Sequence, residues 1–209
     1  MPDKGRSMEA RAGRIAVGLA LGLVFGLGAW TPGAAQERGS YFGFNVSEPY
    51  SSTAFGFDGR WVFGDGRWAV SGFGSAFTVG DVGSGAWLGE ALLTRGLGDG
   101  PLTRTLYAGA GLRLSGAQRS PTELALPVFV GFRTPVLRAG GWEVGLFGHI
   151  GVARRQAGGE VVYARADRLG IELARGRFHL GISHDDAAGS NTPFHYGGAV
   201  RLSIGLRVR

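Results

Sequence analysis

From residue 40 onward, apolar side chains recur at every second position in most segments of the chain. The final segment shows the pattern clearly, because its two parities differ in character. Its apolar parity holds Tyr196, Val200, Leu202, Ile204, Leu206 and Val208, and its polar parity holds His195, Arg201, Ser203 and Arg207. Successive side chains of a strand point to opposite faces, so this segment predicts a strand with one apolar and one polar face.

Ten segments of this kind, separated by turn residues, predict ten strands, with eight strands as the alternative. They cover residues 40–47, 53–63, 67–79, 85–95, 104–115, 122–133, 142–153, 168–173, 178–183 and 196–208. The third segment is the least regular, because Val70 and Phe73 fall on opposite parities, which predicts a bulge near residues 71–73. No amphipathic helix competes with these segments, so the predicted fold class is all-β.

The polar parity carries charges of both signs, each between apolar neighbours. This arrangement predicts an antiparallel, up-and-down transmembrane β-barrel, because a closed sheet leaves no backbone group unpaired in lipid. A network of ion pairs and hydrogen bonds is expected in its lumen, formed by Arg60, Glu90, Arg113, Glu123, Arg133, Glu143, His149, Arg168, Glu172, His179 and Arg201. With about ten strands, the interior is only slightly wider than side chains can fill, which predicts a plugged or very narrow lumen.

The connections between the predicted strands fall into two sets. Loops on the outer side are expected at residues 48–52, 80–84, 116–121, 154–159 and 185–194, and turns on the inner side at 64–66, 96–103, 134–140 and 175–176. Aromatic residues near the strand ends are expected to form girdles at the two membrane interfaces. These aromatic residues are Tyr41, Trp61, Trp68, Trp87, Trp142, Tyr163 and Tyr196.

The N-terminal residues have the composition of a targeting segment. Residues 4–14 are basic, residues 15–30 carry no charge, and Gly33-Ala34-Ala35 offers small residues for a signal peptidase. A signal peptide at residues 1–35 and a barrel at residues 36–209 are therefore predicted, with an uncleaved anchor as the alternative. The outer membrane of the cell is the expected location.

Composition narrows the function classes. The chain has 22 Lys and Arg against 16 Asp and Glu, without a basic stripe, so no nucleic-acid partner is expected. It has no cysteine, which excludes disulfides and lipoprotein processing. Its 40 glycines alternate with aromatic residues, as a tightly curved sheet requires. No metal site and no cofactor are predicted.

The most site-like segment is residues 184–193, which read HDDAAGSNTP at the outer end of a predicted strand. Together with residues 126–130, 167–170 and 182–184, it resembles the lipid A 3-O-deacylase family of small outer-membrane barrel esterases. That resemblance implies an esterase with His184 as the base on the lipid face. Where the family has its nucleophilic serine, this chain has Asp186, and a carboxylate cannot form an acyl ester that turns over.

No complete catalytic set is therefore predicted, and the candidates are His184, Asp186 and Ser190. A cation site formed by Asp185, Asp186 and Asn191 is the alternative, although these oxygen donors lack the spacing of a calcium loop.

Three functions fit the sequence. The preferred one is a small outer-membrane barrel that is structural or binds a ligand and is not an enzyme. The alternatives are an esterase similar to the deacylases and an accessory barrel for export of a polysaccharide or small solute. The expected partners are outer-membrane lipids, lipopolysaccharide and the barrel-assembly machinery, and the expected state is a monomer.

Overall fold

A computed structural model describes residues 40–48, 53–64, 66–79, 84–98, 100, 103–117, 120–157, 160–186 and 199–208. The predicted signal peptide lies outside the described residues. The strands are β1 (Ser40–Glu48), β2 (Ala54–Phe63), β3 (Trp68–Val79), β4 (Ser84–Gly96), β5 (Leu106–Ala117), β6 (Ser120–Ala139), β7 (Trp142–Ala157), β8 (Glu160–Arg165), β9 (Asp167–Arg175), β10 (Phe178–Asp186) and β11 (Ala199–Val208). A 3-10 turn, η2 (Thr103–Thr105), precedes β5. Among these residues, no helix is long and apolar enough to cross a bilayer.

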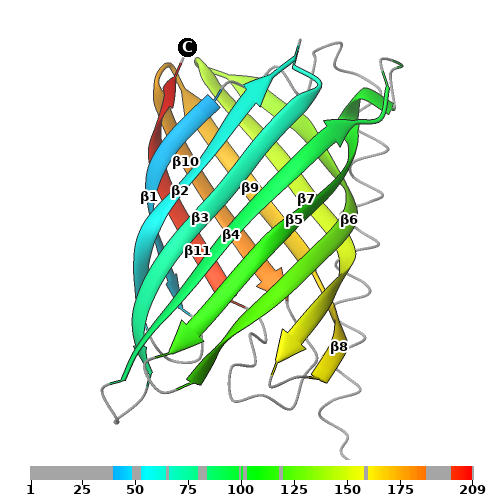
Figure 1. The fold of residues 1–209 in the computed structure, drawn as a ribbon. Helices are drawn as coiled ribbons and strands as arrows, with labels where there is room; N and C mark the ends of the chain where they lie inside the picture. The colour runs from blue at the N-terminus through cyan, green and yellow to red at the C-terminus, as the bar shows by residue number, and fades with distance from the viewer. Residues whose placement is uncertain are drawn as a thin grey trace, which may run out of the picture.

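The strands form one antiparallel sheet that closes on itself (Figure 1). Neighbours in the chain pair with each other, and β1 pairs with β11 over its whole length, from Ser40 opposite Val208 to Glu48 opposite Val200. The pairing of β6 with β7 joins the two ends of the strand order. Each strand from β1 to β7 and from β9 to β11 therefore has a partner on both sides, as lipid requires.

The sheet has eleven strands, but the ring is ten strands wide. Both β8 and β9 pair with β7, and they share one register, in which Val152 lies opposite Arg165 and His149 opposite Arg168. They are two halves of one long strand that is interrupted at Ala166, whose amide donates to the carbonyl of Gly151. The prediction of a ten-stranded, antiparallel, up-and-down transmembrane barrel is confirmed, and the eight-strand alternative is excluded.

The two rims of the barrel differ in their connections. One, called here the turn rim, has three short connections built on glycines with positive φ, namely Gly64, Gly66, Gly140, Gly141 and Gly176, and the longer connection from β4 to β5 that includes η2. Gly140 and Gly141 alone join β6 to β7, a two-residue hairpin that needs positive φ at both positions. The other, called here the loop rim, holds the connection from β10 to β11 at residues 187–198.

Four predicted connections and one predicted bulge are wrong. Residues 116–121 are not all loop, because β5 runs to Ala117 and β6 begins at Ser120. Residues 134–140 are not a turn, because β6 continues to Ala139. Residues 154–159 are not all loop, because β7 runs to Ala157, and the predicted loop 185–194 begins inside β10, which ends at Asp186. The bulge predicted near 71–73 is absent, since β3 keeps one register with both neighbours, and a register shift lies in β6 between Pro135 and Leu137 instead.

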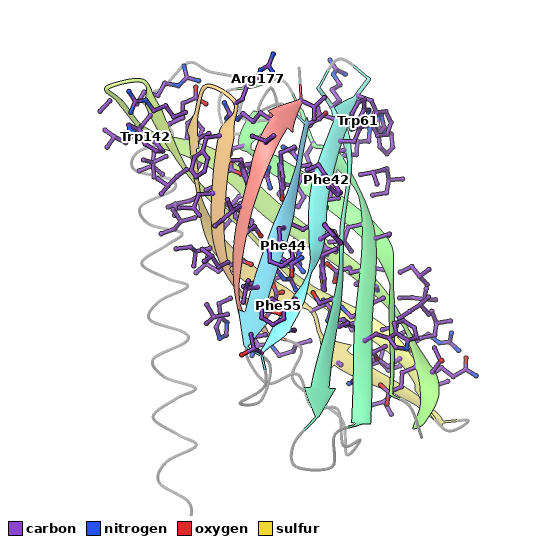
Figure 2. The ribbon with its side chains drawn as sticks, turned by 90° about the vertical axis from the view of Figure 1, so that its left-hand side faces the viewer. Phe42, Phe44, Phe55, Trp61, Trp142 and Arg177 are labelled. Atoms are coloured by element: carbon purple, nitrogen blue, oxygen red, sulfur yellow. The ribbon has the colours of Figure 1, made fainter. Side chains whose placement is uncertain are left out.

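The outward face of the barrel is apolar, as the alternation predicts. Its exposed large side chains include Phe42, Phe44, Phe55, Phe57, Trp61, Val128, Ile150, Val152, Ile182, Val200, Ile204 and Leu206. Figure 2 shows Trp61, Trp142 and Arg177 near the turn rim, with Phe42, Phe44 and Phe55 following β1 and β2 toward the loop rim. This is the band of a barrel surrounded by hydrocarbon, with aromatic residues at its edge.

Two of the predicted girdle residues need separate mention. The ring of Tyr41 stacks on that of His179, with centroids 3.9 Å apart, so Tyr41 points into the barrel and not toward lipid. Tyr196 lies outside the described residues.

Candidate functional site: the charged lumen

The inward face of the sheet gathers the charged residues. Residues of the predicted network that are buried here include Arg60, Glu90, Glu123, His149, Glu172, His179 and Arg201. Arg113, Arg133, Glu143 and Arg168 also form ion pairs with carboxylates or guanidinium groups on other strands. Alternation brings all of these side chains to one side of the sheet. Pairing of neighbouring strands brings some of them together, and closure of the sheet brings together those on distant strands.

The middle of the lumen holds a continuous chain of ion pairs. Glu90 on β4 accepts hydrogen bonds from Arg113 Nε at 2.8 Å and from Arg168 Nη2 at 2.7 Å. Arg168 on β9 also pairs with Asp185 on β10, whose Oδ2 lies 2.7 Å from Arg201 Nη2. Three guanidinium groups and two carboxylates therefore alternate across the barrel, with a net charge of +1.

Phe73 lies inside this chain of charges. The guanidinium carbon of Arg201 lies 3.4 Å from the centroid of the Phe73 ring, and that of Arg168 lies 5.6 Å from it. Phe73 is on β3 and Arg168 is on β9, which is five strands away in either direction around the ring. These two side chains therefore meet from opposite walls. Glu90, Asp185, Arg113, Arg168, Arg201 and Phe73 are called the central cluster below.

A second layer of polar side chains lies nearer the turn rim. Arg133 Nη1 is 3.4 Å from Glu172 Oε2, and the hydroxyl of Tyr41 donates to Asp58 Oδ2 at 3.4 Å. His179 lies under Tyr41 in the stack described above. His149 is also covered by an aromatic ring, that of Phe129, at 4.3 Å between centroids.

Further ion pairs lie toward both rims. Near the turn rim, Glu143 Oε2 is 2.9 Å from Arg207 Nη2, and Glu143 Oε1 is 3.3 Å from Arg138 Nε. Toward the loop rim, Glu123 Oε2 lies 2.5 Å from Arg155 Nη2. Charge pairing therefore extends along most of the barrel axis.

A cavity of about 80 Å³ remains between the central cluster and the second layer. Its walls include Tyr41, Asp58, Arg60, Phe73, Glu172, His179 and Arg201. Asp58 Oδ1 and Arg201 Nε have no hydrogen-bond partner among the residues that the structure describes, and both residues border the cavity. A polar cavity of this volume accommodates roughly five water molecules, which supply partners to such atoms.

The candidate residues of the 184–193 segment separate. His184 is exposed on the outward face, and its cross-strand neighbours are Leu169 and Val200. Asp185 lies in β10 and points inward, where its carboxylate is bound by Arg168 and Arg201, so its predicted place in an outer loop is wrong. Its cation ligand role stays a prediction. Asp186 ends β10, while Ser190 and Asn191 lie outside the described residues. In the described part of the chain, no cluster of three or more His, Cys, Asp or Glu residues could hold a metal ion.

The sequence reasoning missed four contributors to the lumen. Phe73 was assigned to an irregular strand, Tyr41 to a girdle, Asp185 to a loop, and Arg155 to a loop as well. In each case the signal was present, because all four lie on the inward parity once their strands are given their full length.

Comparisons with known proteins add little. No family model matches the chain, and no curated protein is similar to it. Among solved structures, it is similar to the β domain of the Bordetella autotransporter Brka, with a TM-score of 0.45 and 14% sequence identity. That likeness covers 81% of this chain and 99% of the autotransporter chain.

Proposed function

We propose that the protein is a small integral barrel of the outer membrane, structural or ligand-binding, whose lumen is closed to the flow of solutes. The apolar outward face supports the membrane location, because exposing so many large apolar side chains to water would cost about 25 cal/mol for each Å². The proposed partners of such a barrel are outer-membrane lipids, lipopolysaccharide and the barrel-assembly machinery. The proposed oligomeric state is a monomer.

The contact between Phe73 and Arg168 carries the proposal of a closed lumen. These side chains come from opposite walls, and the guanidinium carbon of Arg168 lies 5.6 Å from the centroid of the Phe73 ring. Arg168 also reaches Glu90, which lies on β4 next to the strand of Phe73. The distance from Arg168 Nη2 to Glu90 Oε1 is 2.7 Å. An ion entering the lumen would have to break this chain of paired charges.

The direction of the barrel in the membrane follows from its connections. Transmembrane barrels have short turns on the periplasmic side and longer loops outside. The loop rim, with residues 187–198, is therefore assigned to the cell exterior, and the turn rim with Gly140–Gly141 to the periplasm.

Conductance in a planar bilayer tests the closed lumen. The full-length protein should insert, as judged by a heat-sensitive compact band on a gel, and should give no stable conductance steps. The double variant Phe73→Ala, Arg168→Ser should insert and conduct, because both cross-lumen contacts are removed. Steady conductance of the unaltered protein would refute the closed lumen. Absence of the protein from the membrane fraction would refute the membrane location.

The two alternative functions predict other results. An export barrel requires conductance or solute flux through the unaltered protein. An esterase requires loss of an ester-linked acyl chain from lipid A in cells that produce the protein, and it also requires a nucleophile beside His184. The described cross-strand neighbours of His184 are Leu169 and Val200, which have apolar side chains, so the barrel without esterase activity is the preferred proposal.

A further inference from the structure

The lipid-facing side of β7 and β8 changes from apolar to basic near the loop rim. Ile150 and Val152 on β7 are 57% and 53% exposed, and the next outward position on that strand is Arg154, which is also exposed. On β8, Tyr163 lies opposite Arg154, and Arg165 lies opposite Val152. Two arginines and a tyrosine therefore interrupt the apolar band here, and Val161, which is 46% exposed, follows Tyr163 toward the loop rim.

Register places the two arginines close together. Arg154 is opposite Tyr163, and Arg165 follows Tyr163 by two positions, so the two arginines are diagonal neighbours on one face. Such neighbours are about 7–8 Å apart across a sheet, within reach of one bound anion. Like charges at this separation repel each other, and an anion that binds both guanidinium groups offsets that repulsion.

Depth in the membrane identifies the anion. Trp142, at the turn rim, and Arg154 are 12 positions apart on β7. At about 3.3 Å for each position and a strand tilt of about 40°, this span is roughly 30 Å along the membrane normal. The apolar band of a transmembrane barrel is about 25 Å tall, so Arg154 lies at the level of the lipid headgroups on the loop-rim side.

The charges in this patch favour a phosphate. Arg165 pairs with Asp167, and its side chain remains 65% exposed. Arg154 forms no ion pair with another described residue, and the three charged groups of Arg154, Arg165 and Asp167 sum to a net charge of +1. Guanidinium groups bind phosphate oxygens in a bidentate manner, and the 69% exposed Tyr163 between them suits the membrane interface.

We propose that Arg154, Arg165 and Tyr163 form a binding site for a phosphate group of the phosphorylated glycolipid, lipid A, in the outer leaflet. This site is called the headgroup site. The proposal rests on the orientation given above, in which the loop rim faces the cell exterior. It commits to a membrane lipid and not to soluble phosphate, because the site lies on the face that hydrocarbon surrounds.

Lipid binding to the purified full-length barrel in detergent tests the headgroup site, measured by native mass spectrometry. Bisphosphorylated lipid A should bind the unaltered protein. The variant Arg154→Gln, Arg165→Gln should bind it with an affinity lower by at least about tenfold, as expected for lost charge-assisted hydrogen bonds. The matched control is Arg95→Gln, Arg175→Gln. These arginines face outward at the turn rim over Trp68 and Trp142, so this variant should bind like the unaltered protein.

Three results would overturn the headgroup site. The first is equal binding of lipid A by the Arg154→Gln, Arg165→Gln variant. The second is equal binding of fully dephosphorylated lipid A, which would mean apolar contact alone. The third is displacement of lipid A by inorganic phosphate at equal concentration, which would make soluble phosphate the ligand. A barrel that enters the membrane fraction but gives any of these results refutes only this inference, whereas failure to enter that fraction refutes the proposed function.

Discussion

Replacing Glu90 by glutamine is the sharpest test of the central cluster. The Glu90 side chain is 2% exposed and neutralises two guanidinium groups, those of Arg113 and Arg168. At a separation of about 4 Å, each such attraction is worth about 4 kcal/mol with an effective dielectric constant of 20. Desolvation offsets much of this sum, and removal of one partner from a buried pair costs about 3–5 kcal/mol. The variant raises the net charge of the cluster from +1 to +2.

The measurement is a urea titration of the barrel in lipid vesicles, scored by the fraction of the compact, heat-sensitive band. We expect the free energy of unfolding to fall by about 3–5 kcal/mol in Glu90→Gln and to recover partly when Arg113→Gln is added, because the second change returns the net charge to +1. Glu143→Gln is the matched control. It also removes a carboxylate with two arginine partners, but these partners are more exposed, so a loss of about 1 kcal/mol is expected. A loss below about 1 kcal/mol in Glu90→Gln, or no coupling to Arg113→Gln, would refute this account of the cluster.

Three further predictions concern the wall of the barrel. Ile204→Arg, in the middle of β11 on the lipid face, should lower the free energy of unfolding in vesicles by about 2–4 kcal/mol, whereas Val208→Arg at the rim should cost about 0–1 kcal/mol. Gly205→Val should slow closure of the barrel, seen as slower appearance of the compact band on refolding, because a Cβ there would lie 2.6 Å from the carbonyl oxygen of Phe42 on β1. Gly141→Val, at φ 79°, should cost roughly 1–2 kcal/mol, while the same change at a glycine without steric contact and with ordinary φ, Gly85, should cost less. Equal losses of stability in Ile204→Arg and Val208→Arg would contradict the first prediction, and equal losses in Gly141→Val and Gly85→Val would contradict the last.

Alternation predicted the strands well because one physical rule acts at every position. In β11, each side chain must face either hydrocarbon or the lumen, so Leu202 and Arg201 could be assigned without knowledge of any partner. The same rule failed where strand length was misjudged. Assigning polar residues to a loop ends the predicted strand at residue 153, yet Arg154 and Arg155 continue β7 with one side chain outward and one inward.

Aromatic residues caused the other errors. Phe73 lies on the inward parity of β3, and the assumption that a large aromatic side chain must face lipid led to the prediction of a bulge. In the barrel, its ring is useful inside, because it covers the guanidinium groups of Arg168 and Arg201. Tyr41 is a similar case, since its ring is stacked and its hydroxyl is bonded inside the lumen.

The pairing of charges inside the barrel depends on information that alternation does not contain. Glu90 and Arg168 are 78 positions apart and lie on strands that do not pair with each other. Parity assigns both to the lumen, but their meeting depends on how far the registers of all the intervening strand pairs shift them along the axis. Asp185 shows what the alternation of inward and outward side chains predicts and what it leaves open. Parity, extended by one residue beyond His184, places its carboxylate inside. The pairing of β10 with β9 and β11 then puts Arg168 directly opposite Asp185 and Arg201 diagonal to it.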